Sequence, residues 1–468
     1  MIKSYFYIIF FTCAFLWATH FLFWDDLFKI KIKTTADTGK VAVVYLNEKG
    51  KTITASARII KDGLASLRIY AGKIEKLRLI PPEGTKVISV KIIGKKKLSF
   101  NGNTDELSAV SLKAAAHFDF KIFVLVSFLY AAVVHMFLKK ESPFDNHVPQ
   151  MMNIEFLRLI FTLGIVSYHL AERLNIFNEG WLGVEFFFTL SGFFLTVTFN
   201  PDRTTESFVK SKIIRFVPLL FLCAFLGKAK VIPVLSNILF LQSTGLSDDV
   251  VPPQSWFLAV LFWVSLFYFY MMKVCPVKIS RLIFALLTFF SYSACRHFGW
   301  DGMINNIFSV RLIRGVAGIG LGYFTAYFYQ IAVKNEAKST LFYTVLEIIA
   351  LFYAVGLMFF KEIYPENQIV AVIVFAFLIF LFSLKRGNVS QYFNKPFWAK
   401  ISACSFAVYM THWFLVADVV LRWNQKFLVL QHHKYILMAG TILLAWVTGI
   451  FVCKYVEKPI AAFLKKKL

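Results

Sequence analysis

Long apolar runs separated by short polar segments make up most of this chain. A helix that crosses a hydrocarbon core of roughly 30 Å needs about 20 mainly apolar residues, and most of the runs approach that length. The shorter segment Val231–Leu241 is expected to be re-entrant or to lie at the membrane interface. The pattern predicts ten transmembrane helices after residue 150, at about 154–171, 181–199, 213–227, 255–272, 282–295, 311–332, 341–360, 367–384, 401–421 and 435–453.

Two further apolar runs lie in the first third of the chain. The first, Ser4–Trp24, ends in bulky aromatic residues rather than in a small-residue cleavage site, so we interpret it as a retained membrane anchor. The expected organisation is an anchor at 1–24, a β domain at 25–118, a second transmembrane helix with a cytoplasmic linker at 119–149, and a ten-helix membrane domain at 150–468. The predicted fold class is therefore a membrane all-α protein with a small all-β, sandwich-like domain.

The segment between the two N-terminal helices has the alternating pattern of short β-strands. Ile88, Val90 and Ile92 are predicted to share one face, and turn signals at 47–50, 61–63 and 81–84 separate such runs. Few aromatic residues are available to stack on sugars, and the candidates are Tyr45, Tyr70 and Phe100. Two interpretations of this domain stay open. It is a spacer that docks partners such as glycan-assembly proteins, or it binds a glycan.

Composition and charge agree with a membrane protein. Hydrophobic residues make up 58% of the chain, which excludes an ordinary soluble domain, and the formal net charge is +24. Such a charge also occurs in nucleic-acid-binding proteins. Here, however, Lys and Arg lie at the ends of apolar runs, which indicates contact with the membrane surface and with lipid. No nucleic-acid partner is expected. The six cysteines show no spacing typical of a zinc site or of a disulfide framework, so no metal is expected.

The distribution of cations predicts the orientation in the membrane. When the helices alternate across the bilayer, most Lys and Arg residues fall on one side, which the positive-inside rule makes cytoplasmic. Both termini are then cytoplasmic, the β domain is extracytoplasmic, and the protein lies in the cytoplasmic (inner) membrane. Four cations fall on the opposite side and weaken this assignment, namely Lys228, Lys230, Arg296 and Lys361.

A small set of ionisable residues lies inside the predicted helices. Each costs about 2.5–3.5 kcal/mol on insertion scales, so each suggests a function. Glu155, Arg158 and His169 share one helix face at about 100° per residue, and Glu185 on the next helix lies at a depth similar to that of His169. A carboxylate beside an imidazole would raise its basicity. The alternative is that Glu185 pairs only with an arginine such as Arg314.

Five ordered motifs resemble those of the acyltransferase-3 family of integral membrane acyltransferases. They cover about 150–465 and hold in order and spacing. The motifs are 153–158 with Tyr168 and His169, 183–187 with 190–193, Lys212 to Arg215 before Pro218, Ser405–Tyr409 with His412 and Trp413, and Tyr455–Pro459.

The resemblance implies a ten-helix bundle that takes an acyl group, usually acetyl from acetyl-CoA, and delivers it to a carbohydrate or another acceptor. By this resemblance the catalytic residues are His169 as the base, Glu185 as its orienting partner, and Arg158, which also lies at the entrance for the donor. Fixed cationic donors suit the phosphates of coenzyme A. Donor binding is assigned to Arg158, Lys212, Arg215, Ser191 and Gly192, and the tunnel candidates are Glu155, His412 and Arg314.

The leading hypothesis is an enzyme that O-acetylates a cell-surface polysaccharide or its lipid-linked precursor. Acyl-CoA would be a co-substrate, and no permanently bound cofactor is expected. The main alternative is a non-enzymatic membrane protein that binds or translocates a glycan. A third is an inactive family member that acts as a scaffold. For His412 a role in the tunnel and a role as a satisfied core residue stay open, and Glu347 matches no motif but is expected to face the bundle interior.

Overall fold

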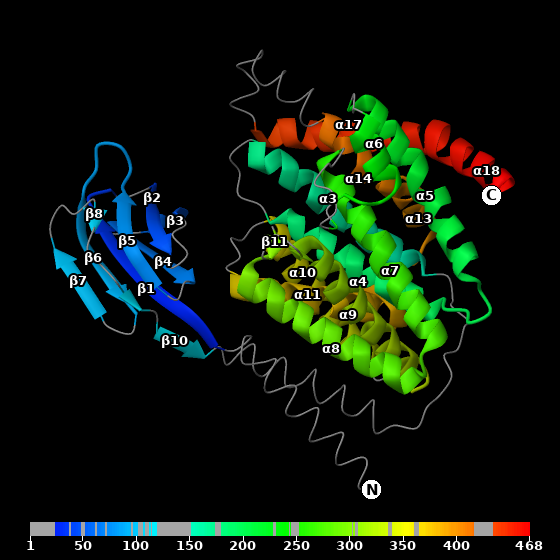
Figure 1. The fold of residues 1–468 in the computed structure, drawn as a ribbon, viewed down its shortest axis with the longest axis horizontal. Coiled ribbons are helices and arrows are strands. Elements are labelled where there is room, and N and C mark those ends of the chain that lie inside the picture. The colour runs from blue at the N-terminus through cyan, green and yellow to red at the C-terminus, as the bar shows by residue number, and fades with distance from the viewer. Residues whose placement is uncertain are drawn as a thin grey trace, which may run out of the picture. The chain divides into compact units, whose positions relative to one another are not determined.

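The computed structural model divides the chain into two compact units, Met1–Val134 and His135–Leu468. Figure 1 shows a β unit and a helical unit. The structure describes residues 24–36, 39–47, 52–60, 63–70, 73–94, 97–101, 106–107, 112–113, 115–118, 151–173, 179–227, 231–242, 244, 252–301, 303–304, 308–335, 339–359, 365–415 and 434–468. Both predicted N-terminal transmembrane segments, 1–24 and 119–149, lie almost entirely outside these residues, and only Trp24 is included.

The first unit is built from antiparallel strands in the order β7-β6-β1-β4-β3-β2-β5-β8, with β10 beside β1 and β9 beside β5. Along the strands, buried side chains alternate with more exposed ones, as the sequence pattern predicts. The strands are β1 Trp24–Thr34, β2 Lys40–Asn47, β3 Thr52–Ile60, β4 Leu64–Tyr70, β5 Lys73–Ile80, β6 Val87–Ile93, β7 Lys97–Asn101, β8 Glu106–Leu107, β9 Leu112–Lys113 and β10 Ala115–Phe118.

The β unit has its own core, and two sequence expectations change there. Ile88 is 42% exposed while Val90 and Ile92 are buried, because the pairing register of β6 with β1 shifts at its start. Tyr45 is only 7% exposed and belongs to the core, where burial raises the pKa of its phenol. Phe100 also packs against this core. The ring of Tyr45 is therefore not displayed for stacking on a sugar, that of Phe100 is partly exposed, and the side chain of Tyr70 lies outside the described residues.

The second unit is helical, and each of the ten predicted runs is occupied by a helix, although the structure describes 401–421 only as far as residue 415. The helices are α3 Met152–Arg173, α4 Gly183–Val197, α5 Thr205–Leu226, α6 Val231–Ile238, α7 Trp256–Val274, α8 Val277–Phe298, α9 Val310–Val333, α10 Thr340–Phe359, α11 Pro365–Leu384, α12 Asn388–Tyr392, α13 Pro396–Ser402, α14 Ser405–Phe414, α17 Lys434–Val452 and α18 Lys458–Lys467.

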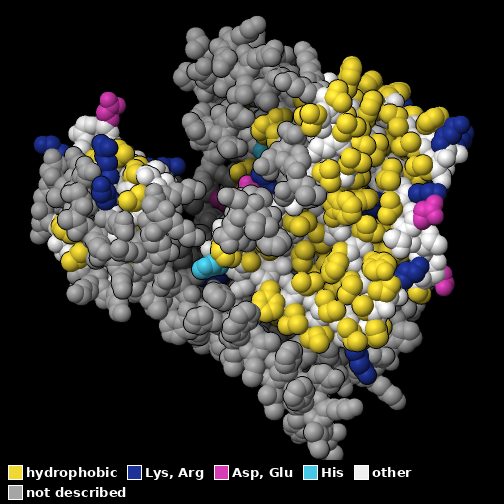
Figure 2. All heavy atoms as spheres, viewed as in Figure 1, with side chains coloured by type: hydrophobic (Ala, Val, Ile, Leu, Met, Phe, Trp, Pro, Cys, Tyr) yellow, Lys and Arg dark blue, Asp and Glu magenta, His cyan; other side chains and the backbone are white. Residues whose placement is uncertain are grey.

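Six segments among the described residues are long and apolar enough to cross a membrane, at 180–197, 253–274, 277–298, 310–333, 340–358 and 436–467. Helices α3 and α5 are not among these six segments, because both contain several charged residues. Hydrophobic side chains cover a broad part of the visible face of the helical unit (Figure 2). Phe225 on α5 is 77% exposed and Phe352 on α10 is 74% exposed. Apolar exposure of this kind is what a lipid-facing surface requires.

The centre of the helical unit is the close crossing of α4 and α9. An added Cβ at Gly192 would lie 2.1 Å from the carbonyl oxygen of Ile319, and one at Gly322 would lie 2.1 Å from the carbonyl oxygen of Thr189. Small residues at such crossings let two backbones approach, which strengthens packing where lipid gives no hydrophobic driving force. Gly192 is therefore a packing residue on the α9 side of α4.

The chain ends in two helices joined by a π-helical turn, Cys453–Glu457. Pro459 lies in the first turn of α18 and has no backbone N–H to donate, which accounts for the local change in helix winding. Ile460, Ala461 and Leu464 form the half-buried face of α18, whereas Phe463 is 59% exposed.

Candidate active site

A cavity of about 360 Å³ opens among α3, α4, α5, α7 and α14. Most of its wall is apolar, with aromatic rings such as Phe187, Phe257 and Phe406. Ser191 lines it, as expected from the sequence, whereas Gly192 does not. The cavity thus has the size and the apolar lining of a small-molecule site, which typically measures roughly 300–1,000 Å³.

Four cations line this cavity, namely Arg158, Arg203, Lys212 and Arg215. The sequence predicted three of them, and the structure brings these three together from α3 and α5. None of the sequence motifs includes Arg203. It lies just before α5, and its guanidinium donates to the hydroxyl of Ser211 at 2.6 Å.

The cations differ in whether a carboxylate neutralises them. Arg158 pairs with Glu155 at 2.9 Å, and Glu155 also accepts a hydrogen bond from Ser402. Glu155 is therefore a partner of Arg158 rather than part of the cavity wall. The ammonium group of Lys212 instead lies over the rings of Phe208 and Phe216, 5.3 and 5.7 Å from their centres. It has no ion pair among the described residues, which leaves its charge available to an anion.

Two imidazoles meet between α3 and α14. The ring centres of His169 and His412 are 5.2 Å apart, and the ring of Trp413 lies 5.3 Å from His169 in an edge-to-face arrangement. Tyr409, which lines the cavity, lies one helical turn before His412, with 6.1 Å between their ring centres. The imidazole pair therefore lies next to one end of the cavity.

The hydrogen bonds of His412 determine its tautomer. Its Nδ1 lies 2.7 Å from the carbonyl oxygen of Tyr409 and 3.2 Å from that of Val408. A carbonyl can only accept, so Nδ1 carries the proton and Nε2 keeps its lone pair. Nε2 is buried, and no described residue hydrogen-bonds to it. His412 thus presents an unprotonated nitrogen in a buried site.

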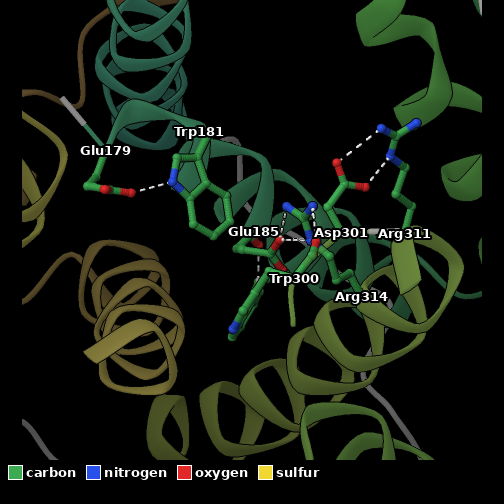
Figure 3. A network of polar contacts seen from close by, with 8 residues as sticks. Glu179, Trp181, Glu185, Trp300, Asp301, Arg311 and Arg314 are labelled. Carbon is green, nitrogen blue, oxygen red and sulfur yellow. Dashed lines mark hydrogen bonds and ion pairs between the residues drawn. The ribbon is translucent and has the colours of Figure 1, made fainter. Parts of the chain in front are cut away.

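Glu185 does not occupy the predicted position beside His169. Its Oε1 accepts from Nη2 of Arg314 at 2.5 Å and from Nε at 2.7 Å, which is the alternative that the sequence left open. The two side chains point toward each other across α4 and α9 (Figure 3). Glu185 is fully buried and the Arg314 side chain is 5% exposed, so the buried carboxylate takes the nearest buried cation as its partner. The prediction of a His169–Glu185 pair was wrong.

Aromatic rings and a second ion pair surround Arg314. Its guanidinium lies 5.3 Å from the ring centre of Trp181 and 5.1 Å from that of Trp256, and it donates to the carbonyl oxygen of Trp300 at 2.9 Å. Arg311 pairs with Asp301 at 2.7 Å, close by in Figure 3. Arg314 is therefore part of a rigid polar cluster that joins α4 to α9, and it does not line the cavity.

Glu347 faces the interior, as expected, and has a structural role. It is fully buried, and its two carboxylate oxygens accept from the backbone N–H groups of Gly387 and Ser390, at 3.2 and 3.0 Å. These groups belong to the start of α12. A carboxylate that accepts the unpaired N–H groups of a helix start stabilises that helix.

Sequence reasoning missed two residues of the site. Arg203 could have been found from its spacing, because Arg203, Ser207 and Ser211 follow at intervals of four residues and are hydrogen-bonded in the structure. Gln254 gave no signal. Its amide nitrogen donates to the carbonyl oxygens of Tyr409 and Met410, at 3.2 and 3.0 Å, and so ties the start of α7 to the helix that carries His412.

Comparison with known proteins supports the resemblance seen in the motifs. The family model of the acyltransferase-3 domain, described as an acyltransferase domain, matches residues 152–456, well over half of the chain. No curated protein and no solved structure matches the chain significantly. The matched region contains the cavity, its four cations and both imidazoles. The chain is therefore a multi-pass membrane protein that belongs to the acyltransferase-3 family.

Proposed function

We propose that the protein transfers an acyl group, acetyl in the simplest case, from cytoplasmic acyl-CoA to a hydroxyl group of an extracytoplasmic or lipid-linked glycan. The observation that carries this proposal is an apolar cavity, with four cations at its proposed mouth, whose wall residue Tyr409 adjoins the imidazole pair of His169 and His412. A bundle of ten membrane helices with both termini in the cytoplasm would place the donor and the acceptor on opposite sides of the imidazoles.

The cavity supports a donor that has both a charged and an apolar part. Arg203 and Lys212 offer charge that no described carboxylate neutralises, which suits phosphate groups. The apolar wall beyond them suits a pantetheine arm and a short acyl chain. This division of the cavity favours acyl-CoA over a donor without phosphates.

The reaction needs a base for the acceptor hydroxyl. In our proposal the hydroxyl oxygen attacks the thioester carbonyl carbon, and its proton passes to the imidazole of His169. The tetrahedral intermediate then expels the thiolate of coenzyme A, which takes that proton and leaves as the free thiol. In its neutral form His412 has its lone pair at Nε2, which can accept a hydrogen bond from the imidazolium beside it.

The test is transfer of radiolabel from acetyl-CoA to membrane glycan, in vesicles that contain the protein. His169→Ala is expected to lower the rate about 10²–10⁴-fold, the contribution of a positioned base. His412→Asn keeps a donor for the carbonyl oxygen of Tyr409 but lacks the Nε2 lone pair, and it is expected to fold and to lose activity as well. His297→Ala on the exposed end of α8 is the matched control and is expected to be fully active.

Each alternative result has a clear meaning. Transfer that is independent of His169 would refute the assignment of the base. Absence of labelled glycan, together with absence of acetyl-CoA binding to the wild-type protein, would refute the enzyme and favour a protein that binds or translocates a glycan.

A further inference from the structure

The C-terminal helix α18 packs against α5 (Figure 1), the helix that carries Lys212 and Arg215 of the cavity wall. At one end, the ammonium group of Lys210 donates to the backbone oxygen of Leu468 at 2.8 Å. At the other, Glu457 interacts electrostatically with Arg215. Because Lys210 precedes Arg215 on α5 while Glu457 precedes Leu468, the two helices are antiparallel. The part of α5 that α18 follows is the part that carries the cations of the mouth.

The end of α18 adds charge at this place. Lys465, Lys466 and Lys467 are exposed, and none forms an ion pair with a described residue. Lys210, on the neighbouring turn of α5, is already paired with Glu206 at 2.7 Å. The surface between α18 and the mouth therefore has several cations whose charge is not neutralised.

The size of the cavity implies that part of the donor stays outside it. About 360 Å³ is near the lower end of the roughly 300–1,000 Å³ typical of small-molecule sites, and coenzyme A is larger than most such ligands. The pantetheine arm accounts for about half of coenzyme A. The nucleotide half, with its phosphates, would then lie in front of the mouth.

We propose that α18 and the first half of α5 form a phosphate-binding surface outside the cavity, with Lys465, Lys466 and Lys467 as its cations and the 3′-phosphate of coenzyme A as its ligand. This inference rests on the proposed function, because it takes the donor to be acyl-CoA. A phosphate monoester carries nearly two negative charges at neutral pH, so a cluster of lysines suits it better than a single one.

The experiment measures binding of coenzyme A and of 3′-dephospho-coenzyme A to the full-length protein in nanodiscs of zwitterionic lipid. It needs no acceptor. The test variant carries Lys→Gln at 465, 466 and 467, and the matched control carries Lys→Gln at 334, 385 and 395, three lysines at other helix ends. Lysines near a charged surface contribute roughly 1 kcal/mol each, so the test variant is expected to raise the Kd for coenzyme A at least tenfold at low salt.

Specificity for the 3′-phosphate decides the outcome. The test variant is expected to leave the Kd for 3′-dephospho-coenzyme A within twofold of the wild-type value, and the control is expected to change neither Kd. The difference between the two ligands should shrink as ionic strength rises, because exposed charges are screened.

Three results would overturn the inference. If the test variant raised the Kd for coenzyme A and for 3′-dephospho-coenzyme A equally, the three lysines would not recognise the 3′-phosphate. An effect that appears only in nanodiscs with anionic lipid would assign the lysines to lipid headgroups. Absence of coenzyme A binding to the wild-type protein would refute the proposed donor and this inference with it, whereas normal binding with an unchanged test variant would refute this inference alone.

Discussion

The ion pair between Glu185 and Arg314 gives the sharpest prediction. Removal of one partner from a buried pair leaves the other charge unpaired, which costs about 3–5 kcal/mol, whereas replacement of both partners by uncharged residues of similar size is often close to neutral. Glu185 is fully buried and Arg314 is 5% exposed, so the pair belongs to this class. Glu185→Gln alone and Arg314→Met alone should each destabilise the helical unit by at least about 3 kcal/mol.

The double variant should recover most of that loss. A loss of about 3 kcal/mol corresponds to a fall in Tm of roughly 4 °C for a unit of this size. The two single variants are expected to show it, and Glu185→Gln with Arg314→Met together should lie several degrees above both. The assay is the thermal loss of the monodisperse peak of purified protein in detergent, with acyl transfer measured in parallel.

The result also separates a structural role from a catalytic one. If Glu185 acted through His169, Glu185→Gln would lower the transfer rate without changing the Tm, and Arg314→Met would leave the rate unchanged. Additive effects of the two single changes on the Tm would show that the side chains do not interact, which would refute the reasoning from burial.

Three further predictions concern packing, capping and a surface pair. Gly192→Val should prevent folding, because its side chain would overlap a backbone carbonyl of α9, whereas Gly440→Val should be tolerated because nothing lies within 4 Å of an added Cβ there; the yield of monodisperse protein measures both. Glu347→Ala should lower the Tm, because two backbone N–H groups lose a charged acceptor worth about 1.5–3 kcal/mol each, while the Kd for coenzyme A stays unchanged. Arg311→Met should change stability by less than about 1 kcal/mol, because its partner Asp301 is 64% exposed.

Opposite outcomes would count against particular parts of the structure. Folded Gly192→Val would mean that α4 and α9 are farther apart than described. An altered Kd for coenzyme A in Glu347→Ala would connect α12 to the donor site. A large loss of stability in Arg311→Met would show that the outer ion pair is as important as the buried one.

The sequence predicted the helices well because each apolar run has one physical solution in a membrane. Backbone polar groups in hydrocarbon must be paired within the segment, so a run of about 20 apolar residues becomes a helix. The cations of the cavity were also predictable, since Arg158, Lys212 and Arg215 all belong to the ordered motifs. His169 and His412 both belong to the motifs, but their contact depends on how α3 packs against α14 and could not be predicted.

The sequence could not predict in the same way which side chains on different helices contact each other. Glu185 and His169 lie at similar depth, and depth was the only criterion that periodicity offered. The rotation of α4 about its axis is set by the close approach of its glycines to α9, and that rotation directs Glu185 toward Arg314 instead. A similar argument holds for Ile88. A shift in the register between β6 and β1 turns its side chain away from the core, and the alternating pattern of β6 alone does not reveal this shift.

The π-helical turn at Cys453–Glu457 limits how the end of this chain can change during evolution. The apolar helix and its extension, 436–467, measure about 48 Å at 1.5 Å per residue, which exceeds a hydrocarbon core of roughly 30 Å, so the last turns emerge from the membrane. Insertion or deletion of one residue between α17 and α18 would rotate every later side chain by about 100°. The face formed by Ile460, Ala461 and Leu464 would then leave α5. We expect homologues to keep the number of residues in this turn.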